Sequence, residues 1–161
     1  MQKLTGFIVV ATALASSAAF ADKITFKRAH VTIDVPDNWS STSNGDQITL
    51  TDKHEDVGIA FGVIDAGAVH DATKAARQNL RASVEDLTFS KPEPIEINGM
   101  SGFMFTGDGM KDGVNIDLAV LVLDTPADDR DLMVIALGED AKLARHEDEI
   151  QHIFRNLRPR N

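Results

Sequence analysis

The 161-residue chain contains no cysteine, no tyrosine and a single tryptophan. The lack of thiols excludes a disulfide-stapled miniprotein, a thiolate zinc site, an iron–sulfur centre, a cysteine hydrolase and a thioredoxin-like redox site. Basic residues are scarce as well, because 16 Lys and Arg stand against 25 Asp and Glu, which gives a formal charge of -9. This charge repels phosphate backbones and anionic lipid headgroups, so nucleic acids and membrane surfaces are poor partners for the protein as a whole.

The N-terminal segment has the pattern of a secretory signal peptide. Lys3 supplies a positive charge, residues 7–15 form an apolar run, and Ala19-Phe20-Ala21 is a small-x-small cleavage site. The apolar run is shorter than the roughly 20 residues that a membrane-spanning helix needs, and no cysteine follows for lipid attachment. We therefore expect cleavage after Ala21, a periplasmic location without stable membrane insertion, and a single domain over residues 22–161.

Alternation of apolar and polar residues with a period of two predicts most of this domain to be β-structure. The predicted strands span residues 31–35, 47–51, 58–63, 95–97, 103–105, 114–124 and 132–137. The first three are expected to form a meander. Asn98-Gly99 and Asp112-Gly113 are strong hairpin signals, so the strands that flank them should be antiparallel neighbours.

Two segments have the helical period instead, residues 71–87 with Asp71 as the N-cap, and residues 139–156 before Pro159. The strands over 118–123 and 132–137 are apolar on both faces, and such strands must be covered on both sides. The predicted fold class is therefore α+β, an antiparallel β-sheet sandwiched between helical layers (α/β/α).

Three stretches resemble the PsbP/DcrB-like superfamily: V-P-D-N-W at 35–39, I-N-G-M-S-G-F-M-F at 97–105 and I-F-R-N-L-R-P at 153–159. That superfamily includes an extrinsic photosystem II subunit, a Ran-binding nuclear import factor and small bacterial envelope proteins. The resemblance implies an α/β/α sandwich in which Trp39 and Pro36 shape the core and a turn. It also implies a non-enzymatic binding or accessory role without a cofactor.

Candidate catalytic residues fail on their spacing. Ser101 lies in a short M-S-G stretch, but Phe103 stands where a nucleophile elbow needs glycine. His146 is followed by Glu147, but Ile150 occupies the position of the second histidine in a zinc-binding H-E-x-x-H motif. We therefore predict no catalytic residue and no enzyme, and expect His146 at the edge of the core with a hydrogen-bond partner. A hydrolase remains an alternative, and it would need a histidine beside Ser101 or Asp117.

The loop over residues 124–131 concentrates carboxylates. They are Asp124, Asp128, Asp129 and Asp131. Oxygen ligands of this kind suit calcium and other hard cations, so this loop is the candidate for weak divalent-cation binding. The alternative is a solvated hairpin loop in which Pro126 fixes the turn.

Basic residues gather in two places. They are Lys74, Arg77 and Arg81 on the outer face of the first predicted helix, and Arg155, Arg158 and Arg160 at the C-terminus. If both groups lie on one surface, they form a docking patch for an acidic partner, and the alternative is an ordinary solvated helix face. The leading hypothesis is thus a periplasmic non-enzymatic binding or accessory protein that docks to an envelope protein or complex. The other hypothesis is that the chain is a weak divalent-cation or small-ligand binding protein.

Overall fold

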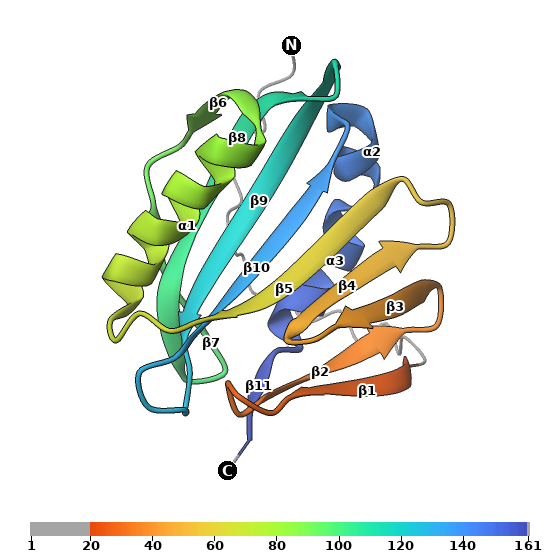
Figure 1. The fold of residues 1–161 in the computed structure, drawn as a ribbon. Helices are drawn as coiled ribbons and strands as arrows, with labels where there is room; N and C mark the ends of the chain where they lie inside the picture. Colours follow the sequence, from red (N-terminus) through yellow and green to blue (C-terminus); the bar gives the residue numbers. More distant parts are fainter. Residues whose placement is uncertain (1–19, 161) are drawn as a thin grey trace.

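Antiparallel strands make up most of the chain in the computed structural model, which describes residues 20–160 (Figure 1). The elements are β1 (Phe20–Phe26), β2 (Val31–Pro36), β3 (Trp39–Asn44), β4 (Gln47–Asp52), β5 (Val57–Ile64), α1 (Val69–Ser83), β6 (Glu85–Phe89), β7 (Glu93–Ile97), β8 (Met100–Lys111), β9 (Val114–Asp124), β10 (Asp131–Gly138), α2 (Asp140–Arg145), α3 (Glu147–Arg155) and β11 (Arg158–Pro159). The signal peptide predicted over residues 1–21 falls almost entirely outside the described residues and stays a prediction.

The strands form two sheets. The large sheet has the order β3-β4-β5-β10-β9-β8-β6, with β7 paired to β8, and the small sheet has the order β1-β2-β11. Every pairing is antiparallel. At the centre of the large sheet, β9 and β10 carry apolar side chains on both faces, with Leu121, Val122 and Leu132 fully buried. The predicted two-sided burial of these strands is confirmed.

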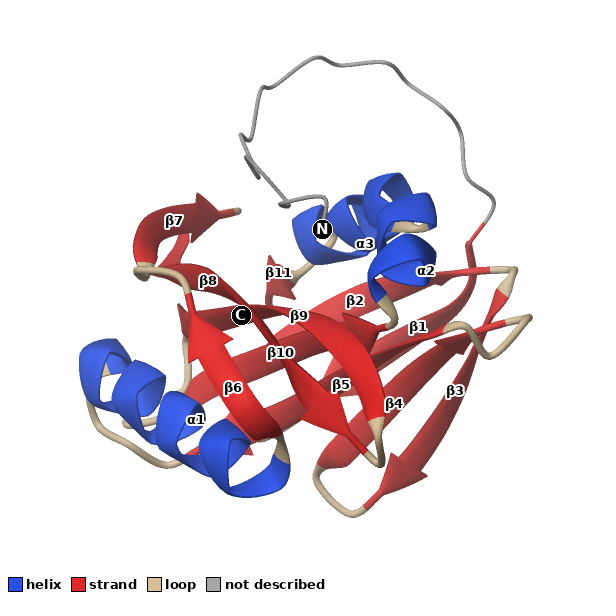
Figure 2. Cartoon of the chain, turned by 90° about the horizontal axis from the view of Figure 1, so that it is seen from above, coloured by secondary structure: helices blue, strands red, loops and turns tan. Residues whose placement is uncertain are grey.

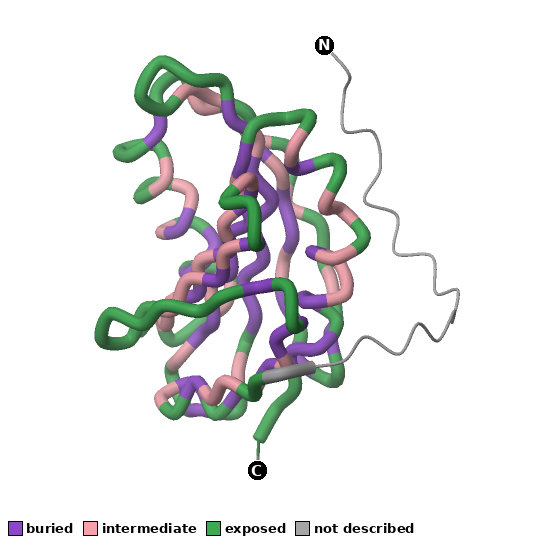
Figure 3. Tube along the Cα trace, turned by 90° about the vertical axis from the view of Figure 1, so that its right-hand side faces the viewer, coloured by how far each residue is buried: buried purple, intermediate pink, exposed green. Residues whose placement is uncertain are grey.

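Each face of the large sheet has its own core, and Figure 3 shows the buried residues concentrated along the strands between them. On one face, Ala72 and Ala76 of α1 pack against Phe105 and Val120. On the other face, α2, α3 and the small sheet enclose a larger core that contains Trp39. Figure 2 shows α1 and the α2–α3 pair on opposite sides of the sheet. The antiparallel sheet is as predicted, but its second face is covered by two short helices together with strands.

The turn signals were interpreted correctly. Asn98 and Gly99 have φ of 50° and 85°, and Asp112 and Gly113 have φ of 52° and 78°. Two consecutive positive φ angles are what a type I′ turn requires, and this turn matches the twist of an antiparallel hairpin. The hairpins β7–β8 and β8–β9 follow directly.

The predicted meander was partly wrong. Strand β2 pairs with β1 and β11 in the small sheet, and the meander consists of β3, β4 and β5. The alternation of apolar and polar residues predicts where strands are, but it does not determine which strands pair with each other.

The two predicted helices also differ from the structure. Helix α1 begins at Val69 after Ala68, with no side-chain cap from Asp71, and ends at Ser83. From Glu85 the chain forms β6, whose backbone lies close to that of β8. A Cβ at Gly107 would lie 2.8 Å from the carbonyl oxygen of Thr88, and one at Gly109 would lie 2.9 Å from that of Glu85. The C-terminal helix is divided into α2 and α3 at His146, where φ is -100° and ψ is 8°. Within residues 20–160, no helix is long and apolar enough to cross a membrane.

Candidate functional site

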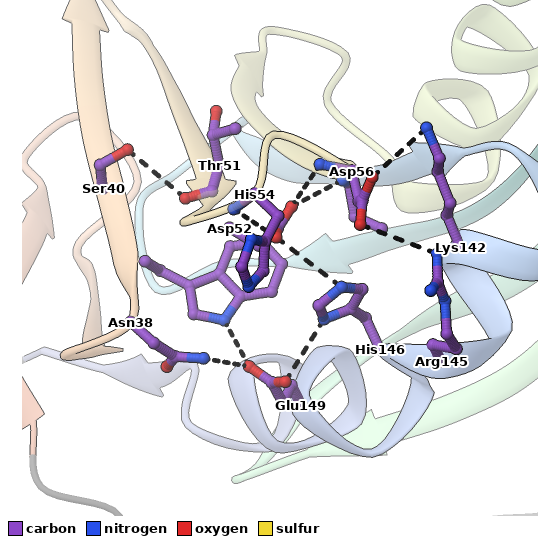
Figure 4. Close-up of polar contacts among 12 residues, drawn as sticks. Asn38, Ser40, Thr51, Asp52, His54, Asp56, Lys142, Arg145, His146 and Glu149 are labelled. Atoms are coloured by element: carbon purple, nitrogen blue, oxygen red, sulfur yellow. Dashed lines mark hydrogen bonds and ion pairs between the residues drawn. The ribbon is translucent and has the colours of Figure 1, made fainter.

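A polar network joins the start of β3 to α3 through Glu149 (Figure 4). The indole Nε1 of buried Trp39 donates to Glu149 Oε2 at 2.8 Å, and Asn38 Nδ2 donates to the same oxygen at 2.7 Å. The other carboxylate oxygen lies 3.3 Å from His146 Nδ1. Burial raises the pKa of Glu149, but the hydrogen bonds from Trp39, Asn38 and His146 outweigh it, so the pKa lies below its usual value.

Asp52, the last residue of β4, holds the turn into β5. Its side chain is 1% exposed. Its Oδ1 accepts hydrogen bonds from the backbone N–H groups of Asp56 at 2.7 Å and Val57 at 2.8 Å, and its Oδ2 accepts one from His54 at 2.9 Å. Burial raises the pKa of Asp52. The three backbone hydrogen bonds and the nearby His146 lower the pKa by more than burial raises it, so the pKa lies below its usual value.

His146 lies between these two carboxylates. Its Nε2 is 3.7 Å from Asp52 Oδ2, and its Nδ1 faces Glu149. The edge of its ring packs against Trp39, with ring centroids 6.2 Å apart. Both ring nitrogens are thus directed at acidic partners, which confirms the expected position at the edge of the core.

Asp52, Asp56 and His146 are also the one trio in the described part of the chain whose potential ligand atoms all lie within 4.8 Å of one another. Their environment does not fit a metal ion. Asp52 already holds three backbone N–H groups, and Asp56 faces Lys142 at 3.3 Å and Arg145 at 3.8 Å. A divalent cation would lie beside two positive charges and compete for the carboxylate that shapes the β4–β5 turn. The arrangement is that of a structural network.

Of the four carboxylates in the loop predicted to bind cations, the structure brings two together. Asp131 lies directly opposite Asp124 in the β9–β10 register. Asp131 is 2% exposed, and its Oδ2 is buried without a hydrogen-bond partner. Burial, and then the charge of Asp124, raise the pKa of Asp131 to about 6. Asp128 and Asp129 are exposed, and within residues 20–160 no three of the loop's carboxylates converge as metal ligands do. Cation binding there stays a prediction.

A second acidic group lies at the opposite end of β9. Asp117 is paired across the strands with Asp108 and lies beside Asp140. Burial first, and then Asp140 and Asp108, raise the pKa of Asp117 to about 6. Ser101, the other residue of the hydrolase alternative, is exposed on β8 opposite Glu96. The groups around Asp117 are therefore carboxylates, and they favour its protonated form.

Solved structures share this fold at low sequence identity. Cyanobacterial PsbP (CyanoP) from Synechocystis matches with a TM-score of 0.57 at 8% identity, covering 92% of this chain and 97% of that protein. The Ran-binding protein Mog1p of Saccharomyces cerevisiae gives 0.56 at 11% identity, with coverages of 86% and 95%. LpqN of Mycobacterium tuberculosis, described as involved in cell envelope biogenesis, gives 0.56 at 15%, with coverages of 80% and 82%.

This chain has the PsbP/Mog1/DcrB-like fold. It also matches 89% of its length to a Bacteroides thetaiotaomicron protein, with a TM-score of 0.60 at 10% identity, but spans only 50% of that protein. The sequence itself matches no family model and no curated protein.

On the PsbP/Mog1/DcrB-like fold, the two predicted basic groups lie on opposite sides of the large sheet (Figure 2). On α1, the guanidinium of Arg77 lies 5.0 Å from the ring centroid of Phe89, and that of Arg81 lies 5.2 Å from it. Arg77 also lies 5.6 Å from the ring of buried Phe105, so it faces the sheet and not the outer side of the helix as predicted. At the C-terminus, Arg158 faces Asp34 at 3.9 Å. The C-terminal group is further divided, because Arg155 donates to Gln151 while Arg160 lines a surface hollow. A single combined patch is therefore not formed.

The network around Glu149 was not predicted as a unit. His146 and Trp39 were each assigned a position in the core, but Asp52 and Glu149 were not singled out. A histidine followed three positions later by a glutamate, on a helix stripe that is otherwise apolar, is the signal that could have indicated a polar pair facing the core.

Proposed function

We propose that this chain is an exported, non-enzymatic binding or accessory protein that docks to an acidic partner protein of the bacterial envelope through α1. The observation that carries the proposal is the pair of α1 arginines held over Phe89. The names of two fold neighbours support the class of function, since Mog1p is described as Ran-binding and LpqN as involved in envelope biogenesis. In this proposal the signal peptide is removed after Ala21, and residues 22–161 form an α/β/α sandwich.

The arginines of α1 are positioned before any partner arrives. Arg77 and Arg81 are four residues apart, so they lie on the same side of the helix, and both guanidinium groups stack on Phe89 of β6. Stacking restricts the rotamers of a long side chain, and this reduces the entropy that binding would otherwise cost. Arginine is also among the residues that contribute most to protein interfaces.

The charges of Lys74 and Arg81 are exposed to a partner, whereas Arg77 is half-buried and its Nε is buried without a hydrogen-bond partner. Lys74 is exposed one turn before Arg77 on the same helix. Within the described residues, Lys74, Arg77 and Arg81 form no ion pair with an Asp or Glu of the chain itself. A local positive patch on a protein with a formal charge of -9 favours an acidic partner and speeds its association.

Photo-crosslinking followed by a binding measurement tests this proposal. A photoreactive residue at position 74 should capture a partner in cells that the same residue at Lys53, in the β4–β5 turn, does not capture. The captured protein is then purified and its affinity measured. The double variant Lys74→Gln/Arg81→Gln should bind at least tenfold more weakly, and binding of the wild type should weaken with salt.

The matched control is Lys53→Gln/Arg155→Gln, which removes the same charge from exposed positions away from α1, in the β4–β5 turn and on α3. It should bind like the wild type. Thermal melts of both double variants establish that they are folded. Equal affinity of the α1 variant and the control for the purified partner would refute docking through α1.

A second candidate function, weak divalent-cation binding at the 124–131 loop, has one observation in its favour. Asp131 Oδ2 is buried without a hydrogen-bond partner, next to Asp124. A cation that binds only the folded protein must raise the melting temperature. Millimolar Ca²⁺, Mn²⁺ or Zn²⁺ should raise it in the wild type but not in Asp131→Asn, and an equal response of the two proteins would contradict binding at this loop.

A further inference from the structure

The turn between β1 and β2 presents polar side chains on one side and buries the other. Phe26 and Ala29 are buried, and the Ala29 N–H donates to the Phe26 carbonyl at 3.2 Å. Thr25 precedes Phe26 in β1 and is half-buried, while Lys27 follows Phe26 at the start of the turn and is exposed. The turn ends at His30, whose φ is 53° and whose side chain is exposed.

The end of the chain is anchored beside this turn. Pro159 of β11 is paired with Val31 of β2, and the Arg160 N–H donates to the His30 carbonyl at 2.7 Å. Figure 1 shows β11 passing beside the β1–β2 turn. A backbone hydrogen bond of this length fixes where the Arg160 side chain leaves the chain. The basic side chains of two distant segments therefore meet at one place.

Between them lies a hollow of about 250 Å³ lined by Thr25, Lys27, His30 and Arg160. Among residues 20–160, no acidic side chain lines it. Lysine and arginine can only donate hydrogen bonds, while the threonine hydroxyl and the imidazole can donate as well as accept. The lining therefore suits a ligand that carries several acceptor oxygens and negative charge.

The surrounding charges do not neutralise this lining. Arg28, the neighbour of Lys27, is paired with Asp46 and Asp65, and Asp34 faces Arg158. In the part of the chain that the structure describes, Lys27, His30 and Arg160 have no acidic partner. The nearby carboxylates are thus engaged by other cations, while the cations of the hollow remain unpaired.

We propose that this hollow is a binding site for the phosphate group of a small phosphorylated ligand. A phosphate monoester has three terminal oxygens and close to two negative charges, enough acceptors for the donors of Lys27, His30 and Arg160 together. A volume of about 250 Å³ equals that of roughly eight water molecules, which leaves room for a short group attached to the phosphate. The formal charge of -9 favours a soluble ligand over an anionic membrane surface.

NMR of the histidine ring signals tests the site on the purified protein. The chain has five histidines, and the His30 signal is assigned by its loss in His30→Gln. Titration with inorganic phosphate, and then with glycerol 3-phosphate, at constant ionic strength should shift the His30 signal saturably. Chloride in place of phosphate should not. Arg160→Gln and Lys27→Gln should each weaken phosphate binding by about tenfold, because each removes a charge-assisted hydrogen bond.

Lys91→Gln serves as the control, because it removes one exposed charge outside the hollow and should leave phosphate affinity unchanged. Sedimentation with vesicles that contain phosphatidic acid, a lipid phosphate monoester, distinguishes the two sources of phosphate. No binding to these vesicles is expected for a soluble ligand, and binding that Lys27→Gln and Arg160→Gln both weaken would replace the soluble ligand by a lipid. A linear His30 shift that chloride reproduces, or phosphate binding that Arg160→Gln does not weaken, would overturn the proposal. The residues of the hollow lie outside α1, so this outcome is independent of docking through that helix.

Discussion

Glu149 shows how much of the structure can depend on one side chain. Its carboxylate joins α3 to residues 110 and 111 positions earlier in the chain, Trp39 and Asn38. Removing it leaves the indole N–H of Trp39 without a partner at a position only 6% exposed. We predict that Glu149→Ala lowers the free energy of unfolding by about 1–3 kcal/mol, measured by urea denaturation at pH 7.

The comparison that isolates this effect is Asp148→Ala, which removes an exposed acidic residue from the same helical turn. Its loss should not exceed about 1 kcal/mol, because it changes only the interaction with the helix dipole. Glu149→Gln should fall between the two, since an amide oxygen still accepts from Trp39. Equal losses for Glu149→Ala and Asp148→Ala would show that the network adds no stability.

Part of this network could be predicted from individual residues. The place of Trp39 in the core follows from its position after a turn, and that of His146 follows from the apolar stripe of its helix. Asp52 gave no such signal, because an aspartate at the end of a strand is usually a solvated turn residue. Its burial depends on the packing of α2 and α3 over the β4–β5 turn, which is tertiary information.

At the level of elements, strand β8 depends on glycine for its pairing. A Cβ at Gly102 would come within 2.0 Å of the carbonyl oxygen of Val122 in β9. We predict that Gly102→Ala lowers the free energy of unfolding by at least about 2 kcal/mol, because the backbones of β8 and β9 must separate to accept the methyl group.

The same substitution at Gly62 of β5 is the matched test. A Cβ there would meet nothing within 4 Å. Gly62→Ala should change stability by less than about 0.5 kcal/mol or increase it slightly, since alanine reduces the entropy of the unfolded chain. If urea denaturation shows similar changes for the two variants, then steric contact at Gly102 is not the cause.

The elements that were predicted well are those defined by local chemistry. Both Asn-Gly and Asp-Gly turns fix positive φ angles within the hairpin itself, so no distant contact is needed. Strand β6 was mistaken for helix because Val84 and Leu87 continue the apolar spacing of α1. Pairing with β8 overrides that periodicity.

At the scale of the whole molecule, coverage of both sheet faces follows from β9 and β10, which are apolar on both sides. The identity of the covering elements does not. The small sheet joins β1 and β2 to β11 at the other end of the chain, and no local sequence pattern predicts a pairing between segments so far apart. For the same reason, the hollow that contains Arg160 could not be predicted from sequence.

The balance of buried carboxyl groups also sets how the stability of the whole protein varies with pH. Asp117 and Asp131 have pKa values of about 6 in the folded protein, against an ordinary value of 3.8. Between about pH 4 and 6 the unfolded chain has released these protons while the folded protein still holds them. Stability should therefore fall as the pH rises through this window.

Asp52 and Glu149 act in the opposite direction. Their pKa values are lowered from 3.8 and 4.5 by folding, so the stability they contribute is present above those values and is lost as the pH falls below them. Self-repulsion is also smallest near the isoelectric point of about 4.9. We therefore predict maximal stability between about pH 4 and 5, measured by urea denaturation from pH 3 to 8.

Asparagine variants separate the two contributions. The double variant Asp117→Asn/Asp131→Asn should be more stable than the wild type at pH 7 by about 1–3 kcal/mol, since it removes two carboxylates that are held in unfavourable sites. That difference should disappear near pH 4, where both aspartates are already protonated in the folded protein. Asp112→Asn, at an exposed hairpin turn, provides the control and should show no such dependence. A double variant that is no more stable than the wild type at pH 7 would contradict the assignment, because it would show that ionising these two carboxyl groups costs the folded protein nothing.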